Sequence, residues 1–414
     1  METNQKKEKL AIIFPGQGAQ YAGMGKQLYQ NYEVVREVYK EADEVLGFHL
    51  RRLIDSGDMA ELQKPEILQP TLITVAYSYY RLVEEQFGVI ADYYAGHSLG
   101  ELTALLAAGV FDFKTAIELA RIRGQIMDET TTDLEGGGML AISNISYDLL
   151  QDICLDYQEK GKPVYLSNEN SYQQLVVSGL KSNLDDFTEK IKAEGGKIIP
   201  VRVTLPFHSP YMKEASVRFK EVLDEYEFSG RSEKVIANAT ARPYDADIAE
   251  MLSEQLISPV RWIDTINYMK DQGVLFVLEM GPSRILGRFA KDIDSDLIVQ
   301  ELDRPKEPYY AYQLFRENKL FNKNHLMDRL LGIAVSTKNY NYDALNYTEN
   351  VVKPYRELTM LVQSLEESQQ EIKEEDINKS VGLLREILEG KNCDPNERAN
   401  YKRDLMAETM LSFG

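Results

Sequence analysis

The sequence predicts an α/β protein with a parallel sheet in its larger domain, an inserted ferredoxin-like subdomain and a helical C-terminal extension. The first supporting observation is the alternation of strand-like and helical patterns through the first three hundred residues. A buried strand at 10–14 is followed by helical periodicity near 22–41, 71–86 and 113–130. The second observation is a change in this order after the three glycines at 136–138. The third is the amphipathic helical pattern of the last hundred residues.

After the three glycines, the predicted order of elements becomes β-α-β-β-α-β, which is the ferredoxin-like order. The strands of this segment are expected at 139–142, 164–166, 175–177 and 198–203, and the helices at 147–157 and 182–193. We therefore expect a small subdomain at 137–203. It interrupts a larger domain that is formed by 1–136 and 204–304.

The larger domain resumes after the insertion, and a different segment follows it. Its remaining elements are expected as helices at 210–224, 247–257 and 260–271 and strands at 234–236 and 274–278. From 305 to 414 we expect a mainly helical extension, with helices near 355–373 and 378–390. Within the last helix, apolar residues recur on one face, which predicts packing; they are Val381, Leu384, Ile387 and Leu388.

Composition excludes several classes of function. A formal net charge of −19 argues against binding nucleic acid, because a phosphate backbone requires a basic face. The N-terminus lacks the apolar stretch of a secretory signal, and no apolar run approaches the roughly 20 residues of a membrane helix. Cys154 and Cys393 lie far apart, which favours neither a disulfide framework nor a cysteine-based metal site. We expect a cytoplasmic protein that binds no metal.

Residues 96–100 read Gly-His-Ser-Leu-Gly and form the most informative motif of the chain. An apolar, strand-like run at 89–94 precedes them, and a helical run at 102–108 follows. Strand, Gly-x-Ser-x-Gly and helix together predict a nucleophile elbow, in which Ser98 is held above the sheet at the start of a helix. Glycine is needed at 96 and 100 because larger side chains would clash within so tight a turn.

A serine nucleophile requires a base, and the chain has four histidines. His97 is expected to point away from its neighbour Ser98, and His49 and His325 lie in polar surface or tail contexts. His208 remains, after the last strand of the small subdomain, where the alternative is an ordinary structural histidine. The elbow geometry also gives the backbone N–H of Leu99 as one donor of an oxyanion hole.

Two further features have both a functional and a plain structural interpretation. The turn at 15–18 could supply a second oxyanion donor, or it could be an ordinary tight turn. Arg123 could hold a carboxylate in its guanidinium fork, or it could be a solvated charge on a helix. The residues themselves leave both alternatives open.

Together these segments resemble the malonyl-CoA:acyl carrier protein transacylases and the acyltransferase domains of polyketide synthases. The resemblance runs from about residue 10 to 300 and includes several separated motifs in the order typical of the family. These motifs are 14–18 (Phe-Pro-Gly-Gln-Gly), 69–70 (Gln-Pro), 96–101 (Gly-His-Ser-Leu-Gly-Glu), 123–124 (Arg-Gly), 168–171 (Asn-Glu-Asn-Ser), 207–209 (Phe-His-Ser), 255–256 (Gln-Leu), 259–262 (Pro-Val-Arg-Trp) and 281–282 (Gly-Pro).

The resemblance implies an α/β-hydrolase-like core and a role for each matching residue. Ser98 would carry a malonyl group from malonyl-CoA to the phosphopantetheine thiol of an acyl carrier protein, with His208 as its base. Gln17 and Leu99 would supply the oxyanion N–H groups. The remaining implied residues are Arg123 for the malonyl carboxylate, Gln69 and Phe207 in the same pocket, and Gln255, whose backbone carbonyl would orient the histidine.

The resemblance implies no cofactor beyond the coenzyme A thioester, which is a substrate. A free-standing enzyme that serves a polyketide synthase in trans would account for the long extension, although fatty-acid synthesis is equally compatible. Two alternatives stay open: a hydrolase that clears acyl chains from carrier proteins, and a docking protein with vestigial catalysis. Carrier proteins are usually acidic, so a local basic patch is needed, and we expect it at Arg284, Arg288 and Lys291.

Overall fold

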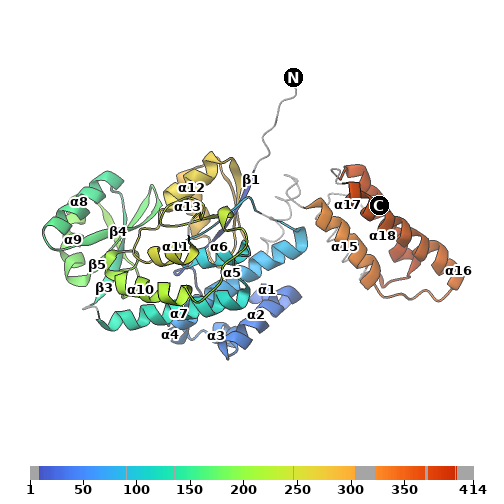
Figure 1. The fold of residues 1–414 in the computed structure, drawn as a ribbon, viewed down its shortest axis with the longest axis horizontal. Coiled ribbons are helices and arrows are strands. Elements are labelled where there is room, and N and C mark those ends of the chain that lie inside the picture. The colour runs from blue at the N-terminus through green and yellow to red at the C-terminus, as the bar shows by residue number, and fades with distance from the viewer. Residues whose placement is uncertain are drawn as a thin grey trace, which may run out of the picture. The chain divides into compact units, whose positions relative to one another are not determined.

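The structure is a computed structural model that describes residues 9–89, 91–133, 136–245, 247–303, 322–368, 372–396 and 398. The chain divides into two compact units (Figure 1). The first unit comprises residues 1–82 and 91–307, and the second comprises 83–90 and 308–414. Each unit has its own hydrophobic core.

The larger sheet of the first unit is fully parallel, with strand order β7-β2-β1-β8-β9. Its strands are β1 (Lys9–Phe14), β2 (Tyr93–Gly96), β7 (Val235–Ile236), β8 (Val274–Glu279) and β9 (Ile298–Glu301). The central strand β1 is buried from Leu10 to Phe14, as expected for a strand that is covered on both faces. Because all strands run the same way, the carboxyl ends of β1 and β2 lie side by side.

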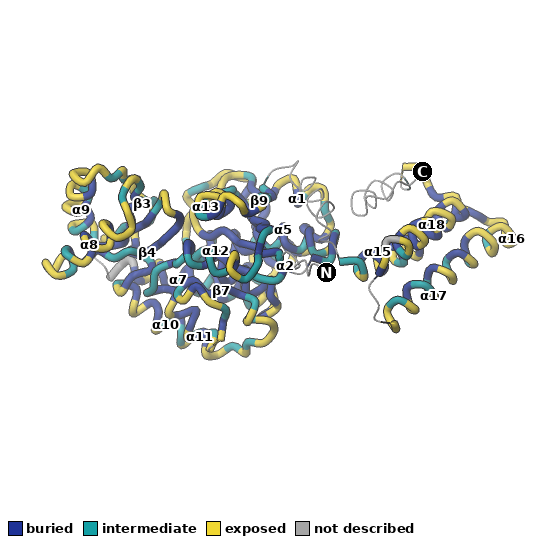
Figure 2. Tube along the Cα trace, turned by 90° about the horizontal axis from the view of Figure 1, so that it is seen from above, coloured by how far each residue is buried: buried dark blue, intermediate teal, exposed yellow. Residues whose placement is uncertain are grey.

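Helices cover both faces of this sheet. Alternate residues of β1 contact different layers, because side chains of a strand point to opposite faces in turn. Ala11 and Ile13 pack with α12 (Trp262–Asp271) and α13 (Ile285–Ile293). On the opposite face, Phe14 packs against Tyr80 of α5 (Pro65–Phe87). In Figure 2 the central strands β1 and β8 are mostly buried, and exposed residues follow the outer faces of helices such as α8, α9 and α10.

The remaining helices of the first unit lie between its strands in the sequence. They are α1 (Lys26–Asn31), α2 (Glu33–Leu46), α3 (Leu50–Ser56), α4 (Met59–Leu62), α6 (Gly100–Ala107), α7 (Phe113–Asp133), α8 (Tyr147–Glu159), α9 (Lys181–Ala193), α10 (Lys213–Leu223) and α11 (Ile248–Glu254).

The smaller sheet of the first unit is antiparallel, with order β4-β5-β3-β6. Its strands are β3 (Gly137–Ser143), β4 (Val164–Ser171), β5 (Gln174–Leu180) and β6 (Lys197–Pro200). Helices α8 and α9 pack on one face through a core that includes Ile153 and Phe187. The order of elements and of strands is the ferredoxin-like one, as predicted.

The second unit is helical and packs around its own apolar cluster. Its helices are α15 (Lys323–Ser336), α16 (Ala344–Tyr347), a π-helical turn at Thr348–Val352, α17 (Lys353–Ser368) and α18 (Glu374–Gly390). The predicted apolar face of the last helix is buried in this cluster, and Leu384 and Ile387 are completely inaccessible. The Lys391 ammonium donates to the carbonyls of Ala334 and Thr337 at the end of α15.

Three local features differ from the sequence-based expectation. Helices α3 and α4 and strand β9 were not expected, because each is short and has no strong periodicity. Strand β2 begins only at Tyr93, since the Asp92 carboxylate accepts the Leu10 N–H in place of a backbone partner. The last strand of the small subdomain ends at Pro200, not at residue 203. None of the helices in the described part of the chain is long and apolar enough to cross a membrane.

We expect Gly100→Ala to destabilise the first unit. A Cβ atom at this position would lie 2.1 Å from the Phe14 carbonyl oxygen, so the elbow would have to move off β1. Overpacking of this kind costs about 1–3 kcal/mol in the free energy of unfolding. Gly332→Ala is the matched control, since nothing lies within 4 Å of its position in α15. It should stabilise the second unit by about 0.5–1 kcal/mol. Calorimetry of both variants measures these effects, and an undiminished stability of Gly100→Ala would contradict the packing argument.

Candidate active site

Ser98 lies on a tight turn between β2 and α6 with a left-handed backbone conformation, φ +52°. This conformation is unfavourable for a residue with a side chain. The flanking glycines are needed for space: a Cβ atom at Gly96 would lie 1.9 Å from the Gly100 carbonyl. The geometry is that of a nucleophile elbow, with the serine at the start of a helix and at the carboxyl edge of the sheet.

His208 is the histidine that the fold brings to Ser98. Its Nε2 lies 2.8 Å from the serine Oγ, and the imidazole is buried, with 4% of its surface exposed. Its Nδ1 lies 2.9 Å from the backbone carbonyl oxygen of Gln255, to which the Nδ1–H group donates a hydrogen bond. This bond fixes the tautomer that leaves Nε2 free to accept the serine proton. His208 also has a left-handed backbone, φ +55°.

Burial lowers the pKa of His208 to about 3, and the cation of Arg123 contributes to the same direction. The imidazole is therefore neutral at physiological pH and can act as a base. Among the described residues no carboxylate contacts its Nδ1, so the pair is a dyad whose orienting group is a backbone carbonyl. This carbonyl stabilises an imidazolium less than a carboxylate would, because it carries only a partial charge.

The other histidines have different contacts. His97 points away from Ser98, donates from Nε2 to Asn170 Oδ1 over 2.8 Å, and packs against the ring of Trp262. His49 is exposed and pairs with Asp43 on the surface. His325 belongs to the second unit and contacts the Glu85 carbonyl. None of them reaches Ser98 in the part of the chain that the structure describes.

The loop after β1 lies directly against the elbow. A Cβ atom at Gly16 would lie 2.3 Å from the His97 carbonyl oxygen and 3.4 Å from the Leu99 backbone nitrogen. This close approach places the next residue, Gln17, at the same edge of the sheet as Leu99. Gln17 and Leu99 are the two residues at which the sequence predicts the donors of an oxyanion hole.

Arg123 of α7 is buried, with 3% of its surface exposed, and its guanidinium contacts neutral groups. Nη1 donates to Gln69 Oε1 over 2.9 Å, and Nη2 donates to Gln255 Oε1 over 3.2 Å. The Met127 sulfur also lies near Nη1. Burial lowers the pKa of Arg123 to about 10, so the side chain remains a cation at neutral pH. A buried cation held by amide oxygens is suited to bind a carboxylate.

Glu101 is a buried carboxylate whose charge acts on this cation, and the Gln255 side chain links the two. Gln255 Nε2 donates to Glu101 Oε2 over 2.7 Å and to the Ser98 carbonyl over 2.9 Å. The Tyr244 hydroxyl donates to the other carboxylate oxygen. Burial raises the pKa of Glu101 to about 7, against the opposing effect of these donors and of Arg123.

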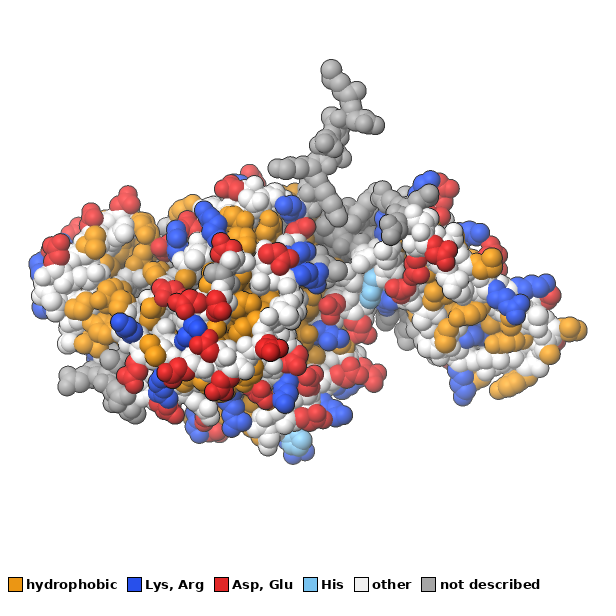
Figure 3. Space-filling view, in the orientation of Figure 1, with side chains coloured by type: hydrophobic (Ala, Val, Ile, Leu, Met, Phe, Trp, Pro, Cys, Tyr) orange, Lys and Arg blue, Asp and Glu red, His pale blue; other side chains and the backbone are white. Residues whose placement is uncertain are grey.

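The remaining predicted residues differ in their surroundings. Phe207 is half-buried beside His208, and its carbonyl accepts from the Ser178 hydroxyl. Arg288 on α13 is exposed, whereas Arg284 is half-buried. The Lys291 ammonium donates to the carbonyls of Ser295 and Leu297 after the helix, so it is engaged within its own chain. In Figure 3 basic and acidic side chains are interspersed on the visible face of the first unit.

Sequence reasoning missed two polar residues that contact the elbow: Asn238 and Tyr244. Both follow β7 in a loop, and no motif or spacing marks either of them. The carboxylate of Glu101 was visible in the motif at 96–101, but its burial was not predictable from one sequence. Asn238 and Tyr244 reach this motif from about 140 residues away in the sequence.

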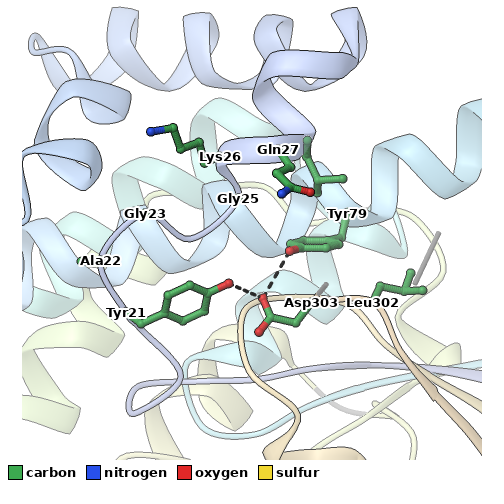
Figure 4. A pocket seen from close by; sticks show the side chains of 10 residues that line it. Tyr21, Ala22, Gly23, Gly25, Lys26, Gln27, Tyr79, Leu302 and Asp303 are labelled. Carbon is green, nitrogen blue, oxygen red and sulfur yellow. Dashed lines mark hydrogen bonds between the residues drawn. The ribbon is translucent and has the colours of Figure 1, made fainter. Parts of the chain in front are cut away.

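A separate cavity of about 350 Å³ lies beside the loop that follows Gln17 (Figure 4). The hydroxyls of Tyr21 and Tyr79 both reach Asp303 Oδ1, over 2.6 and 3.3 Å. These bonds tie the chain after β9 to α5 and to the loop after β1. The cavity contains neither Ser98 nor His208. No group of three or more His, Cys, Asp or Glu side chains suited to a metal ion occurs among the described residues.

Comparison with known proteins identifies the family. The acyl transferase domain family matches residues 11–292. A malonyl CoA-acyl carrier protein transacylase of Bacillus subtilis strain 168 is 38% identical over 312 residues, which cover 75% of this chain and 98% of that protein. A second one from Bacillus subtilis is 30% identical over 386 residues, covering 92% of this chain and 96% of that protein. This second alignment therefore extends into the C-terminal unit.

This chain is also similar to a solved structure of the same kind of enzyme. It contains a malonyl-transacylase in complex with a type II polyketide synthase acyl-carrier protein. The superposition of the two chains has a TM-score of 0.70 and 34% sequence identity, and it covers 73% of this chain and 98% of the solved one. The chain belongs to the acyl transferase domain family. The resemblance predicted from its separated motifs is thereby confirmed.

We expect the His208 ring to stay neutral between pH 8 and pH 5. Its folded-state pKa of about 3 lies below this interval, because burial and the Arg123 cation both disfavour the imidazolium. Protein NMR with labelled histidine measures the ring shifts across the interval, and His208→Asn assigns the resonance. The shifts should remain those of the neutral tautomer protonated at Nδ1. A titration midpoint between pH 6 and 7 would rule out this assignment.

Proposed function

We propose that this protein transfers a malonyl group from malonyl-CoA to the phosphopantetheine thiol of an acyl carrier protein. The observation that carries the proposal is one buried site with three parts: the Ser98–His208 pair, the adjacent backbone N–H groups, and the Arg123 cation. The pair supports formation of an acyl-enzyme. The cation supports selection of an acyl group with a free carboxylate. The family relatives support the same substrate and the same acceptor.

In the first half-reaction, Ser98 Oγ attacks the thioester carbonyl while His208 Nε2 takes the hydroxyl proton. The N–H groups of Leu99 and Gln17 stabilise the oxyanion that forms. The C–S bond then breaks, and His208 returns its proton to the departing coenzyme A thiolate. The product is coenzyme A, with the malonyl group held as an ester on Ser98.

The second half-reaction uses the same groups in reverse. The carrier thiol gives its proton to His208 and attacks the ester carbonyl, and the proton then returns to Ser98 Oγ. No cofactor takes part in this scheme. The malonyl carboxylate pairs with Arg123, while Gln69 and Phe207 form part of the acyl pocket. Because the Arg123 cation lowers the pKa of His208, its neutralisation by this carboxylate makes the histidine a stronger base.

Arg123 separates this proposal from a hydrolase that removes acyl chains from carrier proteins. A hydrolase for uncharged acyl groups has no use for a buried guanidinium, which is costly to desolvate. The site therefore favours transfer of a charged acyl group. Malonyl transfer serves both fatty-acid and polyketide synthesis, and one solved relative is a malonyl-transacylase in complex with a type II polyketide synthase acyl-carrier protein.

Malonyl-CoA should label Ser98 much faster than acetyl-CoA, and Arg123→Ala should remove most of this preference. Loss of charged hydrogen bonds worth about 1.5–3 kcal/mol corresponds to a roughly 10- to 150-fold effect. Intact-protein mass spectrometry after rapid quenching measures the labelling rates. Arg121→Ala is the matched control, since Arg121 lies on the same helix and donates to the Leu46 carbonyl instead. Equal labelling of the wild-type protein by both thioesters would refute malonyl selection.

Carrier docking is expected to depend on Arg288, the exposed member of the predicted basic group. Arg288→Glu should lower the rate of transfer to an acidic carrier protein, with a larger effect at low salt. The rate at which malonyl-CoA labels Ser98, corrected for hydrolysis of the ester, should not change. Lys40→Glu on α2, where Lys40 is highly exposed, controls for net charge. If both variants transfer equally well, the carrier protein docks elsewhere.

A further inference from the structure

We propose that Asn238 is a positioning residue that holds the nucleophile elbow in its strained conformation. Its side-chain amide bridges the two backbone groups on either side of His97. Asn238 Oδ1 accepts the Ser98 N–H over 2.7 Å, and Nδ2 donates to the Gly96 carbonyl over 2.6 Å. The inference rests on the proposed role of Ser98 as the nucleophile.

The amide takes the place of a strand at a point where the sheet ends. Strand β7 pairs with β2 only at Tyr94 and Ala95, through Val235 and Ile236. The chain then leaves the sheet in a tight loop, in which Ala237 and Arg242 are hydrogen-bonded. A carboxamide has one N–H donor and one carbonyl acceptor facing the elbow, as a peptide group does. Asn238 thus continues the hydrogen bonding of the sheet past the last residue of β7.

Asn238 is itself fixed on both sides. Its backbone N–H donates to Glu101 Oε2 over 3.0 Å, and its carbonyl accepts the Arg261 N–H over 3.1 Å. The residue is completely inaccessible to solvent. Glu101 lies on α6, the helix that begins just after Ser98. The contacts therefore form a closed ring, in which the elbow contacts the Asn238 side chain, the Asn238 backbone contacts Glu101, and α6 leads back to the elbow. The side chain has no room to adopt another rotamer without leaving buried groups unpaired.

The strain at Ser98 gives this ring a function. A non-glycine residue in the left-handed region costs of order 1–3 kcal/mol and persists only where its surroundings impose it. If the Ser98 N–H and the Gly96 carbonyl lost their partner, the turn could relax toward ordinary backbone angles. Ser98 Oγ would then leave its position 2.8 Å from His208 Nε2, and the Leu99 N–H would turn with it. A misplacement of about 1 Å can cost about 100-fold in rate.

The test uses the full chain with Asn238→Asp and Asn238→Ala. The aspartate keeps the shape of the side chain but has no donor for the Gly96 carbonyl. The alanine removes both bonds. Folding around the elbow is checked by the emission of Trp262, the single tryptophan of the sequence, which is fully buried and packs against His97. Ser216→Ala is the matched control, because it removes one buried bond, to the Ser253 carbonyl, away from the elbow.

The probe is diisopropyl fluorophosphate, which is uncharged and needs no contact with Arg123. Ser98 Oγ forms a bond to phosphorus, the P–F bond breaks, fluoride leaves, and His208 takes the hydroxyl proton. Mass spectrometry measures the rate of modification at Ser98. We expect both Asn238 variants to react about 100-fold more slowly than the wild type, and Ser216→Ala to react at the wild-type rate.

Single-turnover acylation by malonyl-CoA gives a second, independent measurement. The maximal rate should fall in the Asn238 variants, while the half-saturating concentration stays unchanged, because Asn238 does not contact the Arg123 pocket. A folded Asn238→Asp protein that reacts within threefold of the wild type would overturn the inference and leave the proposed function intact. If the wild type itself is not modified at Ser98, the proposed nucleophile fails, and the inference fails with it.

Discussion

One residue at the end of α11, Gln255, links the main groups of the candidate site through its hydrogen bonds. Its backbone carbonyl orients His208, and its side chain contacts Arg123, Glu101 and the Ser98 carbonyl. His208, Arg123 and the turn at Ser98 therefore share one support. A movement of Gln255 would therefore displace all three groups together.

The groups around Gln255 also explain how the Arg123 cation is stable in a buried position. A guanidinium is costly to bury without compensation. Here neutral amide oxygens satisfy its donors, and the carboxylate of Glu101 offsets its charge from the far side of the Gln255 amide. A direct Arg123–Glu101 pair would compete with the substrate. The amide between them keeps the cation stable and still available.

Much of the fold could be predicted because its elements have strong local patterns. The parallel strands around β1 are continuous apolar runs, and the order of elements from Gly137 to Pro200 is distinctive. Ser98, His208 and Arg123 each lie in a short motif, so the candidate site could also be predicted. The contacts of Asn238 could not be predicted from the sequence, because they depend on where β7 ends in the sheet. Lys291 had the right spacing for a surface patch, but its ammonium instead binds carbonyls at the end of α13.

The sequence alone determined that Ser98 lies on an elbow, because glycines at 96 and 100 are required by backbone contacts only a few residues long. It also determined the βαββαβ insertion, the packed face of the last helix and the acyl transferase resemblance. Only the tertiary structure decided which side chains contact the elbow, and that the Arg123 cation is held by the amides of Gln69 and Gln255. These contacts join residues that are separated by as many as 157 positions. Their geometry is set by where strands end and helices pack, which no local pattern records.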